Sequence, residues 1–359
     1  MKKLIILIIT ILILITGCYD NVELNELSII SGIGIDYAND EYLLTYEILN
    51  DNKSENTGEL LSDTISGTGK TISDAFCDVN NKTSKKDFFA HLKLLVLSES
   101  VINGHLKQIT DYLIRDTDIR DEFLVIISNN NTPEEILSHN NFKYPVASEY
   151  IVKLINNEKY NNSLPTKEIY MNILSKLISK DSDIALNSIS IIDDHLSLND
   201  TYIFNGYNMV TKLDKHLSSL YTLLNKNNPG IEYTNNYNGE YFVINICNVK
   251  TDIDVLSDKI NITANLEAKI LENNSNLNLK DSDTYNMLNQ DFSKLIKEDI
   301  LKFVKELQHY KSDILEFEKI YYKSHNKENK NLWLSANINV KVDLKINYKG
   351  FIFEVENEK

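Results

Sequence analysis

The sequence predicts a mixed α+β protein, with N-terminal α/β lobes followed by a C-terminal antiparallel sheet on which one long amphipathic helix packs. Over residues 64–128 the hydrophobic period switches repeatedly between that of strands and that of helices, which is typical of an α/β lobe. Near the C-terminus, two long alternating segments at 260–270 and 338–348 flank a helical stripe at 288–310. This arrangement predicts a sheet with one face covered by a helix and the other face exposed.

The composition is that of a folded, acidic protein. Its 359 residues carry 37 Lys and Arg against 52 Asp and Glu, for a formal net charge of -15, and 42% of them are hydrophobic. This hydrophobic content argues against a disordered chain, and the length predicts about two domains. The acidic balance, with Arg115 and Arg120 as the two arginines, argues against a protein that binds nucleic acid phosphates.

The first seventeen residues have the pattern of a secretory signal peptide. Lys2 and Lys3 precede an apolar run at 4–15, and small residues close the segment before Cys18. A positive start, an apolar stretch and a small-residue cleavage site are the parts of such a signal. The run is shorter than the roughly 18 to 20 residues that a transmembrane helix needs, so we expect a cleaved signal over 1–17 and no permanent membrane span.

Cys18 is the predicted lipidation site. An apolar residue, two small residues and a cysteine are the bacterial pattern for attaching diacylglycerol to the thiol and cleaving before it, here after Gly17. Loss of 1–17 removes two lysines, so the charge moves from -15 to -17, and an anionic membrane surface repels such a body. Two acyl chains supply stable anchoring. An ordinary cleaved signal or a cytosolic chain are the alternatives.

The mature N-terminal part alternates strands and helices. Residues 27–36 and 42–49 form a predicted hairpin, because two β-prone runs flank a short polar segment. The elements that follow to residue 128 are a short strand near Ile65, a helix from about 71 to 80, a strand at 91–98, a helix from about 101 to 114 and a strand at 122–128.

The next elements lead toward a domain boundary. Pro133 begins a short helix, since proline is tolerated in a first turn. Two helical segments over 148–180 are broken near 161–165, and strands at 184–198 and 201–210 flank a turn at Asn199-Asp200. A run of turn-forming residues at 225–230 marks a further break.

The C-terminal elements have the clearest patterns in the chain. Apolar and polar residues alternate strictly along 260–270 and 338–348, which predicts two strands with one buried face each. Between them, apolar residues repeat at spacings of three and four from Leu288 to Tyr310, and Ser282 or Asp283 can cap the start of this helix. We therefore expect a signal peptide at 1–17, an N-terminal domain at 18–200 with two possible sub-lobes at about 19–130 and 131–200, and a C-terminal domain at 201–359.

No glycine motif in the chain satisfies a nucleotide-binding pattern. Gly67-Thr68-Gly69-Lys70-Thr71 ends like a phosphate-binding loop, but position 64 is threonine where the loop needs glycine. In Gly32-Ile33-Gly34 the third glycine of a dinucleotide fingerprint would fall at Tyr37. We interpret the first segment as a strand and a glycine turn that lead into the helix at Thr71.

The titratable residues nominate no catalytic or metal site. The seven histidines stand singly, without zinc-ligand spacing. Asp193-Asp194-His195 lacks a matching nucleophile motif and is interpreted as a turn, and Asp116, Asp118 and Asp121 lack the glycine and glutamate of a calcium loop. Cys77 and Cys247 are expected to be free and buried, with a disulfide as the alternative. The sequence thus predicts no enzyme, cofactor or metal.

The chain resembles the Ger(x)C family, the lipoprotein C subunits of spore germinant receptors. The most specific block joins the lipidation site to two short motifs, Glu23-Leu24-Asn25-Glu26-Leu27 and Ser31-Gly32-Ile33-Gly34-Ile35-Asp36. Other segments that carry the resemblance are Gly17-Cys18-Tyr19-Asp20, residues 69–76, His91-Leu92-Lys93, residues 113–116, Ile119-Arg120, Gly206, Ser312-Asp313-Ile314, Trp333 and the strand to Gly350.

Two positions depart from the family pattern. Tyr19 stands where the family usually has tryptophan, and Glu316-Phe317-Glu318 replaces a usual glycine-aromatic-glycine turn. Glutamates lack the conformational freedom of glycine, which puts the backbone geometry of that turn in question.

The resemblance implies a non-enzymatic receptor subunit tethered at Cys18 to the outer face of the spore inner membrane. The partners of this subunit would be an A subunit and a transporter-like B subunit. The resemblance does not say whether this chain itself contacts a small molecule. An extracytoplasmic solute-binding lipoprotein of a transporter is the alternative, and an extracytoplasmic hydrolase is a more distant one. A solute-binding protein would call for two similar doubly wound lobes around a cleft.

Overall fold

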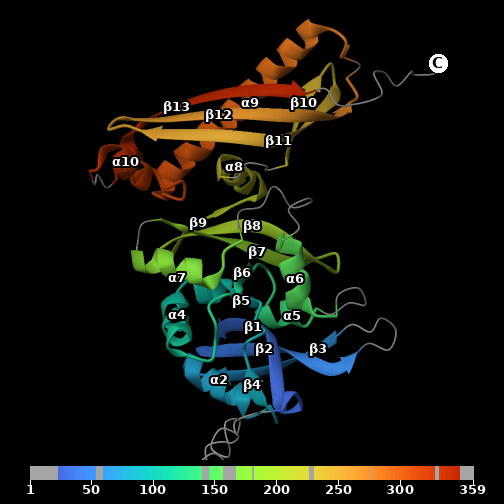
Figure 1. Ribbon diagram of the computed structural model, residues 1–359, viewed down its shortest axis with the longest axis vertical. Helices are drawn as coiled ribbons and strands as arrows, with labels where there is room; N and C mark the ends of the chain where they lie inside the picture. The colour runs from blue at the N-terminus through green and yellow to red at the C-terminus, as the bar shows by residue number, and fades with distance from the viewer. Residues whose placement is uncertain are drawn as a thin grey trace, which may run out of the picture.

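The computed structural model describes residues 23–53, 60–139, 145–156, 167–179, 182–225, 230–275, 277–327 and 331–347. Two sheets follow one another along the long axis of the molecule (Figure 1). The signal peptide, the predicted break at 161–165, most of the predicted break at 225–230, and Gly350 lie outside the described residues. Among the helices of the described residues, none combines the length and the apolar character that crossing a membrane requires.

The first part of the chain contains the elements η1 (Leu24–Glu26), β1 (Leu27–Ala38), β2 (Glu41–Lys53), β3 (Leu60–Gly69), α2 (Ile72–Asn80), β4 (Lys86–Phe88), β5 (Leu94–Ser98), α3 (Glu99–Ile102), α4 (Leu106–Arg115), β6 (Leu124–Ser128), α5 (Pro133–Leu137), α6 (Ala147–Asn156), α7 (Tyr170–Ser179), β7 (Ile184–Ile192), β8 (His195–Asn205) and β9 (Asn208–Leu213). The second part contains α8 (Lys215–Asn225), β10 (Ile231–Tyr237), β11 (Glu240–Val255), β12 (Lys259–Asn273), α9 (Ser282–Tyr310), α10 (Phe317–His325), η2 (Leu332–Ser335) and β13 (Asn337–Asn347).

The first sheet has helices on both faces. Its strand order is β3-β2-β1-β5-β6-β7-β8-β9, with β4 paired to the start of β1. Strands β1, β5, β6 and β7 are mutually parallel, and the outer strands are antiparallel. Along β5, Leu95 and Leu97 pack in the core beneath α2, α4 and α7, whereas Leu94 and Val96 pack beneath α5 and α6. This alternation confirms the predicted α/β lobe.

Two turns in this sheet depend on left-handed backbone conformations. Asn39 and Asp40 join β1 to β2 at φ 53° and 63°, as a two-residue hairpin turn of type I′ requires, so the predicted hairpin is confirmed. Asp193 and Asp194 join β7 to β8 at φ 49° and 63°. The prediction of a turn at Asn199-Asp200 was wrong, because β8 runs through both residues while the preceding aspartates take the turn.

The start of α2 explains the glycine-lysine-threonine segment. The Thr71 side chain accepts a hydrogen bond from Asp74 N and the Asp74 carboxylate accepts one from Thr71 N, which is a capping box with aspartate in the acidic position. A Cβ on Gly69 would lie 2.3 Å from the Ala75 nitrogen. The segment is therefore the strand, turn and helix start that the sequence predicts.

The second sheet is mixed, which corrects the predicted antiparallel arrangement. Strands β10, β11 and β12 are antiparallel, but β13 runs parallel to β12, with Lys259 opposite Asn337 and Lys269 opposite Asn347. Helix α9, at about 1.5 Å per residue, spans roughly 40 Å along the sheet. It carries the chain back toward the end at which β12 began, so β13 starts there and runs in the same direction.

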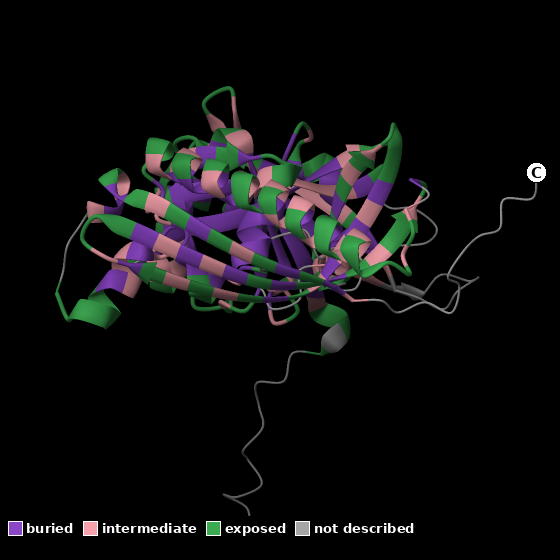
Figure 2. Cartoon of the chain, turned by 90° about the horizontal axis from the view of Figure 1, so that it is seen from above, coloured by how far each residue is buried: buried purple, intermediate pink, exposed green. Residues whose placement is uncertain are grey.

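The predicted amphipathic packing of this second sheet is confirmed. Buried and exposed residues alternate along its strands (Figure 2). Fully buried residues on one side of α9 face the sheet: Leu288, Phe292, Ile296, Ile300, Phe303, Val304 and Leu307. The α9 N-cap is Asp281, one residue before the predicted Ser282.

The remaining differences are local. The helix predicted from about 101 to 114 is two helices, α3 and α4, separated near Gly104. Cys77 and Cys247 are free, but Cys77 is exposed and Cys247 is partly exposed, so the expectation that both are buried was wrong. Residue 200 lies inside β8, which pairs with β7 and β9 in the first sheet, and the division into domains stays a prediction.

Replacing Gly69 by alanine should destabilise the protein by more than about 2 kcal/mol, because the new Cβ would collide with backbone atoms of α2. Urea unfolding followed by circular dichroism measures this change. Gly104→Ala is the matched control, since a Cβ there meets nothing within 4 Å, and its effect should lie within about 1 kcal/mol. Equal stability of the two variants would contradict the steric argument.

Candidate functional site

The predicted lipidation site, Cys18, lies outside the described residues, as does Gly17. The first described residue, Glu23, directly precedes η1 and β1. Five residues of fully extended chain reach at most about 18 Å. A lipid on Cys18 would therefore hold the beginning of β1 close to a membrane surface.

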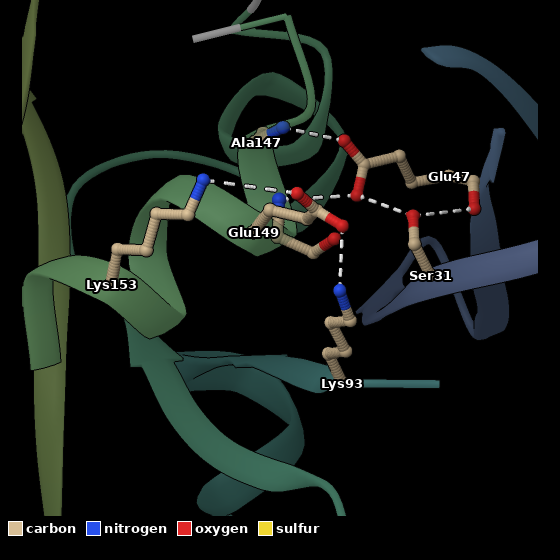
Figure 3. Close-up of polar contacts among 7 residues, drawn as sticks. Ser31, Glu47, Lys93, Ala147, Glu149 and Lys153 are labelled. Carbon is tan, nitrogen blue, oxygen red and sulfur yellow. Dashed lines mark hydrogen bonds and ion pairs between the residues drawn. The ribbon is translucent and has the colours of Figure 1, made fainter. Parts of the chain in front are cut away.

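A buried carboxylate connects three strands of the first sheet to α6, and Figure 3 shows its contacts with Ser31 and Ala147. Glu47, on β2, has no exposed surface. Its carboxylate accepts hydrogen bonds from the Ser31 hydroxyl at 2.9 Å and the Ser62 hydroxyl at 3.0 Å, from β1 and β3. It also accepts from the backbone nitrogens of Ala147 at 2.6 Å and Ser148 at 3.1 Å. Both carboxylate oxygens thus bind the first turn of α6.

This geometry makes Glu47 the N-terminal cap of α6. The first backbone N–H groups of a helix have no partner within the helix, and they carry the positive end of its dipole. Burial raises the pKa of the Glu47 carboxyl, while the hydrogen bonds from Ser31 and Ser148 act in the opposite direction. Since each oxygen already accepts from a backbone N–H, we assign this group a structural role.

Residues of two family-like segments converge at this helix end. Lys93, from His91-Leu92-Lys93, lies 2.5 Å from Glu149 in the first turn of α6. Ser31 binds Glu47, and a Cβ on the adjacent Gly32 would lie 3.0 Å from the Leu137 side chain. The motifs therefore have a common physical basis, which is the close packing of α5 and α6 on β1. Sequence reasoning missed Glu47, although one acidic residue within an apolar strand was the available signal.

A second polar cluster joins the two sheets. The Ser312 hydroxyl, fully buried after α9, donates to Asp183 at 2.8 Å, and the Asn205 amide donates to the same carboxylate at 2.9 Å. Asp183 directly precedes β7 of the first sheet. The family-like segment Ser312-Asp313-Ile314 therefore holds the α9–α10 connection against the first sheet.

Asp313 and Glu316 shape the turn into α10. The Asp313 carboxylate accepts from the backbone nitrogens of Phe317 at 2.6 Å and Glu318 at 3.0 Å. Glu316 has φ 57°, the left-handed conformation that glycine adopts freely. The glutamate at the family's glycine position thus keeps a glycine-like backbone, and Glu318 lies within the helix.

A cavity of about 310 Å³ lies beside this cluster, between the two sheets. Lys176 lines it and pairs with Glu168 at 2.6 Å. Burial raises the pKa of Asp183, and burial with the neighbouring carboxylates Glu318 and Asp183 raises the pKa of Asp313 to about 7. The other lining residues are Asp183, Tyr221, Leu224, Asn225, Thr251, Ile253, Ile314, Leu315, Glu316 and Ile320.

The other candidates from the sequence have separate places in the fold. Asp116 and Asp118 line one hollow after α4, whereas Asp121 is not part of its lining. Asp193 and Asp194 form the β7–β8 turn, and Arg115 pairs with Asp111 rather than with the later aspartates. Within the described ranges, no three His, Cys, Asp or Glu side chains are grouped so that they could hold a metal ion.

Two family models match successive parts of the chain. The spore germination protein N-terminal domain matches residues 20–191. The spore germination B3/GerAC-like C-terminal model matches residues 199–350. Together the two models cover most of the chain.

Curated relatives share the same description. The chain is 29% identical to spore germination protein B3 of Bacillus subtilis (strain 168) over 160 residues, 43% of this chain and 42% of the relative. It is 31% identical to protein KC of the same strain over 141 residues, 37% of this chain and 35% of the relative. It is 30% identical to spore germination protein A3 of the same strain over 201 residues, which are 51% of this chain and 53% of the relative. The chain thus matches about half or less of each relative's length.

A solved structure has the same fold. The crystal structure of the GerBC protein aligns with a TM-score of 0.57, covering 91% of this chain and 99% of that one. At 15% sequence identity, this likeness supports the mixed α/β architecture alone.

Glu47→Gln should lower the free energy of unfolding by about 2 to 3 kcal/mol. Backbone N–H groups face both carboxylate oxygens, so a glutamine must place its NH₂ group against one of them. The comparison variant is Glu149→Gln, which breaks a partly exposed ion pair and should cost less than about 1 kcal/mol. If urea denaturation finds Glu47→Gln no more damaging than Glu149→Gln, the capping role is wrong.

Asp313 should make stability fall as the pH rises. Its pKa is about 7 in the folded protein against 3.8 ordinarily, so the folded state holds an extra proton between about pH 4 and 7. The stabilisation that this proton provides is fully present below about pH 4. It is lost as the pH rises through 7, and the free energy of unfolding falls by up to about 4 kcal/mol. Asp313→Asn, which retains a capping oxygen, should flatten this slope in denaturation at pH 5 and 8. An unchanged slope would contradict the assignment.

Proposed function

The chain belongs to the GerAC-like family of spore germination proteins, and from this premise we propose that it is the lipid-anchored, non-enzymatic C subunit of a nutrient germinant receptor. It would assemble with the membrane A and B subunits to trigger germination. The observation that carries the proposal is the lipidation pattern at Cys18, followed at fixed distances by the family-like N-terminal block.

Anchoring at Cys18 would orient the protein on the extracytoplasmic face of the spore inner membrane. The lipid site precedes Glu23, the first described residue, by five positions, which favours a short distance between the lipid and β1. The start of β1 pairs with β4, and β4 and α2 lie at one end of the long axis, with the second sheet at the other (Figure 1). The first sheet would then lie near the membrane, and the second would project away from it.

The two buried polar clusters both have structural roles. This supports the proposal that the chain binds partner subunits and is not a catalyst. Glu47 caps α6, and Asp183 and Ser312 join the two sheets. We propose that the chain acts by contact with other subunits, and no catalytic, cofactor or metal residue is assigned.

A solute-binding lipoprotein of a transporter is the second candidate. The cavity between the sheets favours it, because such proteins bind their solutes between two lobes. Against it, the second part of the chain has one four-stranded sheet covered by α9 rather than a second doubly wound lobe. Sub-millimolar binding of a small solute that Lys176→Gln abolishes would favour this candidate.

Cys18→Ala should release the protein from the membrane and impair nutrient-triggered germination, because the acidic body then has no anchor. Fractionation of spore membranes with an antibody to the protein measures the release. Germination assays with nutrients and with calcium dipicolinate measure the response, and the second response should persist.

Cys77→Ala is the matched control, since this cysteine is an exposed residue of α2. It should leave both localisation and germination unchanged. Intact nutrient germination in the Cys18→Ala strain, in a background without related receptors, would contradict the proposed function.

A further inference from the structure

A second hollow lies beside the first sheet. Its lining residues come from an earlier part of the chain than those of the cavity between the sheets. This second hollow has a volume of about 300 Å³, at the lower end of the range for small-molecule sites. The hollow lies where α2 and α4 end above the sheet, beside β4. Its lining residues are Tyr46, Phe76, Asn80, Thr83, Lys85, Lys86, Asp87, Phe89, Tyr112, Asp116 and Asp118.

The floor of this hollow is aromatic. The Tyr46 ring lies 5.9 Å from Phe76 and 5.7 Å from Phe89, both edge to face. The Phe76 and Tyr112 rings lie 4.5 Å apart. Tyr46, Phe76 and Phe89 are buried, so the partly exposed Tyr112 ring is the one among these four that a ligand can contact directly. An aromatic ring of this kind offers apolar contact and also attracts a cationic group.

The rim of the hollow carries both signs of charge. Asp116 and Asp118 follow the last residue of α4, and Lys86, at the start of β4, is exposed. Asp87 is half-buried, and desolvation raises its pKa to about 6, so its charge is not fully compensated by its neighbours. A ligand with one cationic and one anionic group would complement both parts of the rim.

The helix ends add to the preference for a cation on the acidic side. Helix α2 ends at Asn80 and α4 at Arg115, and both Asn80 and Asp116 line the hollow. The carboxyl end of a helix carries partial negative charge, which favours cations. Two helix ends, the aspartates and the aromatic floor therefore act together.

We propose that this hollow binds a small zwitterion, whose ammonium group lies against Asp116, Asp118 and the aromatic floor, and whose anionic group contacts Lys86. The same chemistry occurs in a free amino acid and in an aminophosphate headgroup of a lipid. The site depends neither on the lipid anchor nor on receptor assembly. A negative binding result would therefore overturn this proposal and leave the proposed function intact.

Calorimetry on the full chain in neutral detergent micelles tests this site. The probes are L-phenylalanine and glycerophosphoethanolamine for the two sources, with phenethylamine and 3-phenylpropionate as analogues that carry one charge each. A zwitterion should bind with a dissociation constant of about 1 mM. Each analogue that carries only one of the two charges should bind at least about tenfold more weakly. Whichever zwitterion binds more tightly identifies the source.

Two variants locate the binding site. Lys86→Gln and Asp118→Asn should each weaken zwitterion binding about tenfold or more. The matched controls are Lys70→Gln and Asp258→Asn, at exposed positions outside the hollow, which should change nothing. The proposal is overturned if neither zwitterion binds up to about 20 mM, if an analogue binds equally well, or if Lys176→Gln rather than Lys86→Gln abolishes binding.

Discussion

Both sheets depend on one constraint, which is that parallel neighbouring strands can be joined only by a segment long enough to cross a sheet face. In the first sheet, α2, α3, α4 and the α5–α7 segment supply these crossovers and cover both faces. In the second, α9 returns the chain beside the start of β12. The helices are therefore both connections and layers of the core. Their buried apolar residues pack against buried residues of the sheets that they cover.

Buried polar groups then determine how these layers meet. Glu47 binds the first turn of α6, which is 100 residues further along the chain, and Asp183 binds Ser312 across 129 positions. Each buried carboxylate accepts donors from more than one element, which offsets the cost of its burial. Segments that resemble the germination family include partners of these groups, so part of the family pattern is explained by packing.

Short-range pattern predicted much of the fold. The β1–β2 hairpin, α2 with Thr71, the strand β12 and the helix α9 follow from local periodicity and capping. The sequence predicted turns at both Asp193-Asp194-His195 and Asn199-Asp200. The first is confirmed, with both aspartates in the left-handed conformation, whereas β8 runs through the second pair. The site was less predictable, since Glu47 and the hollow beside β4 assemble from distant segments.

The sequence by itself determined the element types, the family and the expected lipidation at Cys18, because these depend on residues close together in the chain. Tertiary structure alone decided that β13 runs parallel to β12, that Ser31, Glu47 and Lys93 converge on α6, and that Cys77 is exposed. The physical reason is that strand direction, burial and charge pairing depend on which distant segments become neighbours. Local periodicity describes one face of one element and does not specify what covers that face.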